Sequence, residues 1–139
     1  MGLARKPAIA LVAAATLLLA VAGGALLLRS GSGGGEAFAL EDQQPRTAGL
    51  YRYVETVPGL AATIPCYCGC GPSLGHTSLL DCFIRPDGKG YGSHASYCAI
   101  CTDEAEQIME LEASGTAPKD IRVAIDGDFS RFGAPTDTP

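Results

Sequence analysis

The six cysteines of this chain are its most reactive side chains, and five of them fall in two closely spaced groups. Three of them alternate with other residues in the run PCYCGCG at positions 65–71, and the last two form a Cys-x-x-Cys pair. Three thiols within one short loop are too crowded to pair with one another without strained small rings. We therefore expect the triplet to meet the downstream cysteines in space, either to form cross-links or to share a soft metal ion.

A metal site is the first interpretation. If a helix over residues 97–113 extends back to His94, then His94, Cys98 and Cys101 share one face, and Met109 follows two turns further on. The cysteine loop could fold over that face. The candidate ligands are Cys66, Cys68, Cys70, Cys82, Cys98, Cys101 and His94.

Two glycines give this loop the freedom to wrap around an ion. Gly69 and Gly71 alternate with the cysteines, and glycine adopts the positive φ angles that a tight wrap needs. His76 follows Gly75 and is expected to cap a short helix or to lie exposed, rather than to bind the ion.

Thiolate and thioether donors favour copper(I) or zinc over calcium or magnesium. Six thiols exceed one tetrahedral zinc site, whereas copper(I) accepts two or three thiolates and can share sulfurs between ions. Met109 is a further donor that zinc would not use. We expect copper(I) first and zinc as the alternative, in a dry pocket that protects the thiols from oxidation.

Disulfides remain the alternative, since small exported domains with an even number of cysteines are commonly cross-linked. Each triplet cysteine would then pair with Cys82, Cys98 or Cys101. The domain would be a disulfide-stabilised interaction module whose partner binds an acidic helix surface. Other cysteine chemistries fit less well: covalent haem needs a histidine where Thr102 stands, and thioredoxin-type exchange needs an α/β domain.

The N-terminal residues predict export. Arg5 and Lys6 precede an uncharged stretch over residues 7–28, about the length that crosses a bilayer as a helix. This segment is either a retained anchor or a cleaved signal. The protein is therefore expected in the cell envelope, on the outer face of the cytoplasmic membrane, or secreted. The predicted organisation is a signal or anchor helix at 1–29, a flexible linker at 30–46, a cysteine-rich helical domain at 47–132 and a disordered tail at 133–139.

The net charge of the chain limits the kinds of partner that it can bind. After Arg29 the chain has seven Lys and Arg against fifteen Asp and Glu, a net charge of seven minus fifteen, or −8. A nucleic-acid partner is not expected for such an acidic domain. The expected partners are the membrane, through the N-terminal helix, and another envelope protein.

Apolar spacing predicts a mostly α fold, a small cysteine-rich bundle of about four short helices with a long cysteine loop. Four glutamates are assigned to the solvated face of the longest helix, and no paired carboxylates or nucleophile indicate an enzyme. The expected helices cover 47–57, 77–83, 97–113 and 118–129, and the glutamates are Glu104, Glu106, Glu110 and Glu112.

These motifs resemble the bacterial PCYCGC-motif family of exported proteins. The resemblance rests on PCYCGCG at 65–71, Gly75-His76, SLLDCF at 78–83, HASYCAIC at 94–101, Asp103-Glu104-Ala105 and KDIR at 119–122. Members of that family are commonly lipoproteins, so the resemblance implies a cysteine-rich envelope domain with a role in metal handling. This chain has no cysteine before Cys66 that could carry the lipid, which favours a transmembrane tether.

Overall fold

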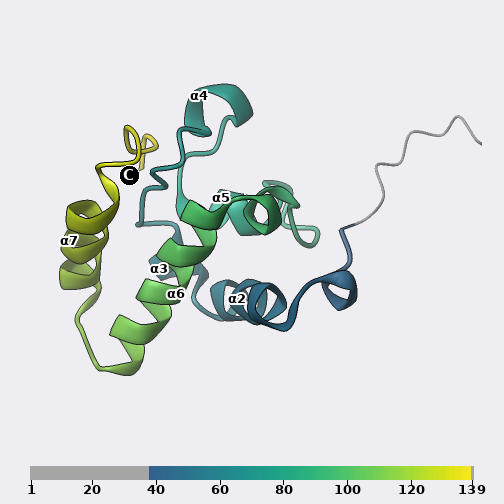
Figure 1. Ribbon diagram of the computed structural model, residues 1–139, viewed down its shortest axis with the longest axis horizontal. Helices are drawn as coiled ribbons and strands as arrows, with labels where there is room; N and C mark the ends of the chain where they lie inside the picture. Colours follow the sequence, from purple (N-terminus) through teal and green to yellow (C-terminus); the bar gives the residue numbers. More distant parts are fainter. Residues whose placement is uncertain (1–37, 139) are drawn as a thin grey trace, which may run out of the picture. The chain divides into compact units, whose positions relative to one another are not determined.

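Helix α6 (Ala99–Ala113) is the element around which the others are arranged (Figure 1). A computed structural model describes residues 38–138, and the predicted anchor helix at 1–29 lies outside the described residues. Helix α6 contacts α2 (Pro45–Thr56), α5 (Leu79–Phe83), α7 (Pro118–Phe129) and the 3-10 helix η2 (His94–Tyr97). The remaining elements are η1 (Leu40–Asp42), α3 (Pro58–Ala61) and α4 (Gly71–Leu74).

Prolines set where several helices begin. Pro45, Pro58 and Pro118 each occupy the first position of a helix, where the missing N–H costs nothing and the fixed φ suits the first turn. Helix α6 ends just before Gly115, whose φ of 80° is the left-handed angle that closes a helix.

The mostly α prediction is confirmed, because residues 38–138 contain six α-helices and a single isolated bridge between Ile84 and Tyr91. The helix predicted at 118–129 has those bounds, and the one predicted at 47–57 begins two residues earlier, at Pro45. Two of the six helices are four-residue turns, which explains why sequence spacing indicated about four.

The helix predicted over 97–113 begins at Ala99 and does not extend back to His94, so His94, Cys98 and Cys101 do not share one helix face. Cys98 has φ −122° and ψ 106°, an extended conformation that separates η2 from α6. His94 therefore lies on a 3-10 turn, and Cys98 stands at the N-cap of α6. The three residues still come together, because the chain turns at Cys98 instead of continuing as a straight helix.

The core lies between α2, α5, α6 and α7. Its largest fully buried side chains include Tyr51, Phe83, Ile108 and Ile121. The Tyr51 ring packs edge-on against Phe83, with ring centroids 4.8 Å apart. This packing joins α2 to α5, the helix that carries Cys82.

Tyr51 also fixes the segment that contains His94. Its hydroxyl donates a hydrogen bond to the carbonyl of Gly92 at 2.7 Å and accepts one from the N–H of Ser96 at 3.1 Å. These two contacts lie on either side of His94 in the sequence. The core residue of α2 thus positions a candidate ligand.

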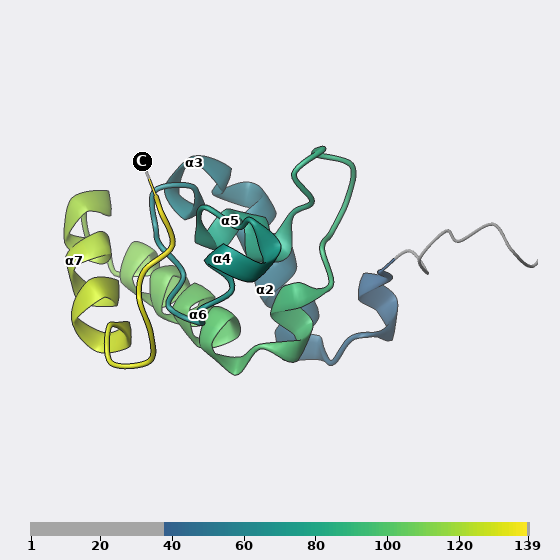
Figure 2. The same cartoon turned by 90° about the horizontal axis from the view of Figure 1, so that it is seen from above.

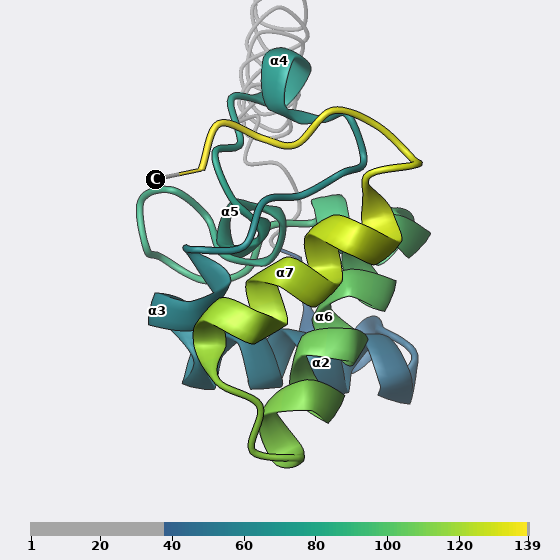
Figure 3. The same ribbon diagram turned by 90° about the vertical axis from the view of Figure 1, so that its left-hand side faces the viewer.

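The C-terminal segment runs beside the loop that precedes α4 (Figures 2 and 3). The N–H of Thr136 donates to the carbonyl of Cys66 at 3.0 Å, and the N–H of Cys66 donates to the Thr136 hydroxyl at 2.9 Å. The polar composition of 133–139 predicts a disordered tail, but in the structure Thr136 is buried against the cysteine loop. Its backbone groups are paired there, which composition alone does not reveal.

No helix within residues 38–138 combines the length and the apolar character that a membrane crossing requires.

Replacing Tyr51 with alanine tests this arrangement. Tyr51 is 0 % exposed, so removing its ring should lower the free energy of unfolding by about 3–5 kcal/mol, as expected for a large buried aromatic side chain. Urea denaturation measures the change. The matched control is Tyr97→Ala, because Tyr97 is 86 % exposed and should change stability by no more than about 0.5 kcal/mol. Equal losses in the two variants would contradict the packing described here.

Candidate metal centre

All six cysteines converge at one place, together with both histidines of the chain. Four overlapping groups have their donor atoms within 4.8 Å of one another. These groups are Cys68, His94, Cys98 and Cys101; Cys70, His76, Cys82 and His94; Cys66, Cys68 and Cys70; and Cys66, Cys82 and Cys101. The predicted meeting of the triplet with the Cys-x-x-Cys pair is confirmed, and Cys82 joins them from α5.

Distances within this cluster suit ion binding. The sulfurs of Cys66 and Cys101 are 3.4 Å apart, and those of Cys70 and Cys82 are 4.0 Å apart. Donors around a tetrahedral ion with bonds of about 2.3 Å lie about 3.8 Å from one another. Only small side-chain shifts would close such a shell.

The cysteines are free thiols in the structure, and all six lie within its described residues. A bonded pair of sulfurs would be about 2.05 Å apart, well below the 3.4 Å between Cys66 and Cys101. The disulfide alternative is therefore not the state that the structure shows.

The cysteine loop is shaped by its two glycines in different ways. Gly69 has a φ of 78°, as predicted for a tight wrap. The same prediction for Gly71 is wrong, because its φ is not positive. A Cβ at Gly71 would instead lie 3.3 Å from Cγ2 of Thr136, so glycine here lets the C-terminal segment approach.

Each histidine directs one ring nitrogen at a thiol. Nε2 of His94 lies 3.5 Å from the sulfur of Cys68, and Nδ1 of His76 lies 3.6 Å from the sulfurs of both Cys70 and Cys82. The two rings are edge to face, with centroids 5.2 Å apart. Burial, followed by the charge of His94, lowers the pKa of His76, which favours the neutral imidazole that binds metals.

The close packing of the thiols lowers the pKa of some of them and raises the pKa of others. Hydrogen bonds from Cys101 and Cys82 lower the pKa of Cys66, whereas donation to Cys101 and Cys66 raises the pKa of Cys82. Burial likewise raises the pKa of Cys70. A buried cluster of this kind holds few thiolates on its own, and a bound cation would compensate the charge of more.

Glu104 is a buried residue that sequence reasoning placed on the solvated face of α6, and that prediction is wrong. Its side chain is 0 % exposed, and Oε1 accepts a hydrogen bond from the N–H of Tyr67 at 2.9 Å. Burial raises the pKa of this carboxyl to about 10. Glu104 thereby fastens the cysteine loop to α6.

The structure brings together every residue that the sequence singled out as a candidate ligand, and it adds His76. In the sequence, His76 could have been recognised as a candidate ligand by its position between Cys70 and Cys82. Its ring reaches these two sulfurs only because the chain turns at Gly75. Met109 is a different case. It lies about 12 Å along α6 from Cys101 at roughly 1.5 Å per residue, too far to share an ion with that thiolate.

Two substitutions at Glu104 test its positioning role. Glu104→Leu removes the acceptor and leaves the buried N–H of Tyr67 unpaired, which should lower the free energy of unfolding by about 1–3 kcal/mol. Glu104→Gln keeps an oxygen acceptor and should cost less than about 1 kcal/mol. Urea denaturation of metal-free, reduced protein measures both. If Gln proves as costly as Leu, the hydrogen bond to Tyr67 is not the reason for this glutamate.

Residues 34–139 match a family described as proteins of unknown function with a PCYCGC motif, and the motif itself is Pro65 to Cys70. No curated protein and no solved structure matches the chain. Because the match covers most of the sequence, including every residue of the cysteine and histidine cluster, the chain belongs to the PCYCGC family.

Proposed function

We propose that this protein binds a soft metal ion, copper(I) in preference to zinc, and acts as a carrier or buffer for it outside the cytoplasm. The observation that carries the proposal is the convergence of six free thiols and two imidazoles within contact distance. Sulfur and neutral imidazole are the donors that these ions prefer.

The number of donors supports copper(I). One zinc ion would use four donors and leave the other thiols without an ion. Copper(I) takes two or three thiolates, and the triads Cys66, Cys68, Cys70 and Cys66, Cys82, Cys101 each offer such a set. Cys66 belongs to both triads and is therefore suited to bridge two ions.

Burial supports a role in holding the ion rather than in catalysis. Cys66, Cys82 and Cys101 are each 0 % exposed, so an ion among them would be shielded from water and oxidants. We propose a carrier or buffer and no enzymatic activity, because the three buried thiolates would fill the coordination shell of copper(I) and leave no open position for a substrate.

The proposed location is the outer face of the cytoplasmic membrane, with the segment 1–29 as an anchor or cleaved signal. The basic pair Arg5 and Lys6 before the uncharged stretch supports this orientation. The ion would pass to another envelope protein.

Anaerobic titration with copper(I) against a competing chelator tests the proposal. The wild-type chain should bind copper(I) more tightly than zinc, and Cys101→Ser should bind less copper(I) because Cys101 belongs to two donor groups. Met109→Leu is the matched control, since it also removes one sulfur but lies well away along α6. Absence of copper(I) binding by the wild-type protein would contradict the function. An equal loss in Met109→Leu would contradict the ligand assignment.

Thiol alkylation distinguishes this function from the disulfide-stabilised module. Protein purified without reductant, treated with a chelator and unfolded in denaturant should alkylate at all six cysteines, because unfolding makes the buried free thiols accessible. Intact mass counts the labels. Protein that takes up no label even after chelation, and takes up six after reduction, would favour the disulfide alternative.

A further inference from the structure

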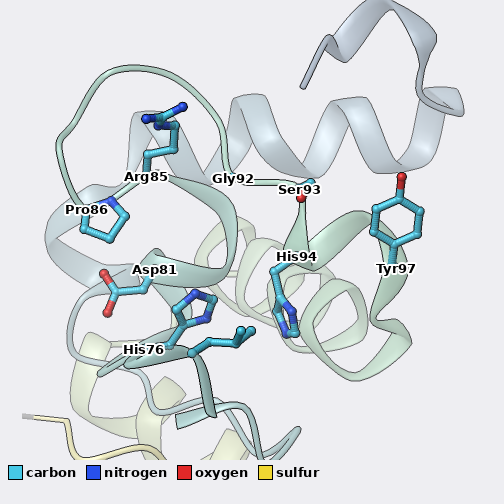
Figure 4. Close-up of a pocket in the computed structure, with 9 residues that line it drawn as sticks. His76, Asp81, Arg85, Pro86, Gly92, Ser93, His94 and Tyr97 are labelled. Atoms are coloured by element: carbon cyan, nitrogen blue, oxygen red, sulfur yellow. The ribbon is translucent and has the colours of Figure 1, made fainter. Parts of the chain in front are cut away.

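A cavity of about 400 Å³ lies directly beside the cluster (Figure 4). Both histidines line it, and none of the cysteines does. His94 comes from η2, and His76 comes from the loop before α5. The two imidazoles thus form the part of the candidate metal centre that faces this opening, and the cysteines lie outside its lining.

The donors differ in how far they lie from water. Cys66, Cys82 and Cys101 are 0 % exposed, whereas His76 and His94 are half-buried. A ligand arriving from solvent can reach the imidazoles through the cavity but cannot reach the three buried sulfurs directly. The cluster therefore has an inner station, formed by those three thiols, and an outer station, formed by the histidines with the half-buried Cys68 and Cys98.

Contacts link the two stations in short steps. Nδ1 of His76 is 3.6 Å from the sulfur of Cys82, which belongs to the inner station. On the other side, Nε2 of His94 is 3.5 Å from the sulfur of Cys68, and Cys68 and His94 also share a donor group with Cys101. An ion could move from an imidazole to an inner thiol by exchanging one donor at a time.

The chemistry of the donors gives this path a direction. Thiolates hold soft ions more firmly than imidazole does. An ion that enters at the histidines would be drawn towards the sulfurs, and an ion leaving would be released most readily from the histidine side. The cavity volume falls in the range of small-molecule sites, so a small ligand that brings or removes the ion fits beside the histidines.

We propose that His76 and His94 form an exchange station through which copper(I) enters and leaves, while Cys66, Cys82 and Cys101 retain it. This inference rests on the proposed function. It adds that the cluster has two unequal populations of ions, one that exchanges quickly and one that exchanges slowly, and that the cavity in Figure 4 is the entrance.

Exchange kinetics on the full chain test the inference. Copper(I), supplied anaerobically as its acetonitrile complex, is loaded to saturation and then withdrawn by bicinchoninate, whose copper complex is coloured. Wild-type protein should release the ion in a fast phase and a slow phase. The His76→Asn, His94→Gln double variant should lose the fast phase and exchange at least about tenfold more slowly, as a barrier higher by about 1.4 kcal/mol predicts.

The two substitutions are chosen to keep the shape of the site. The side-chain amide of Asn stands near the Nδ1 that His76 directs at sulfur, and that of Gln stands near the Nε2 of His94, but amides are poor donors for copper(I). Tyr97→Phe is the matched control, since it changes a residue that lines the same cavity, keeps the ring in place and offers no soft donor. It should leave both phases unchanged.

A reciprocal variant keeps the test decisive if the double variant folds poorly. Cys66→Ser should remove the slow phase and preserve the fast one. Copper(I) binding with the same two phases in the wild-type protein and the histidine variant would overturn the exchange station while leaving the proposed function intact. Failure of the wild-type protein to bind copper(I) at all would instead overturn the proposed function.

Discussion

The attachment of the cysteine loop at two consecutive residues is the constraint on which the cluster of thiols and imidazoles depends. Cys66 is paired with Thr136 of the C-terminal segment, and the N–H of Tyr67 is bonded to the buried carboxyl of Glu104 on α6. Without these contacts, a loop rich in glycine would sample many conformations, and its three thiols would rarely meet Cys101. The order of this loop comes from distant parts of the chain.

The same contacts explain why the cluster is compact. A small domain with short helices buries little apolar surface. The free-energy cost of bringing six thiols together must therefore be offset by packing or by a bound ligand. Tyr51 contributes packing, because its ring joins α2 to α5 and its hydroxyl holds the segment that contains His94. A bound ion would contribute further, since binding to the folded state alone stabilises that state.

Local features of the sequence predicted local structure well. Pro118 and the spacing of Ile121, Ile125 and Phe129 were sufficient to define α7, because helix initiation and an apolar stripe depend on neighbouring residues. The break at Cys98 was not predicted, since the helical spacing continues through it and its extended backbone is imposed by the surrounding fold.

The sequence predicted the candidate ligands better than the residues that hold them in place. Soft donors at short spacings indicated which residues would meet, whereas Glu104 resembled any charged residue on a helix surface. Its burial depends on the loop that covers it, and no periodicity in α6 reveals that cover. The sequence also did not indicate His76 as a ligand, because only the turn at Gly75 brings its ring to Cys70 and Cys82.

The pairing of Cys66 with Thr136 also imposes an order on biosynthesis. The two residues are 70 positions apart, so a growing chain exposes its cysteine triplet well before the segment that pairs with it has been made. During that interval the thiols are exposed to oxidation and to binding of other metal ions. The thiol cluster can therefore form in full only after the C-terminal segment has been synthesised and Thr136 lies against the loop.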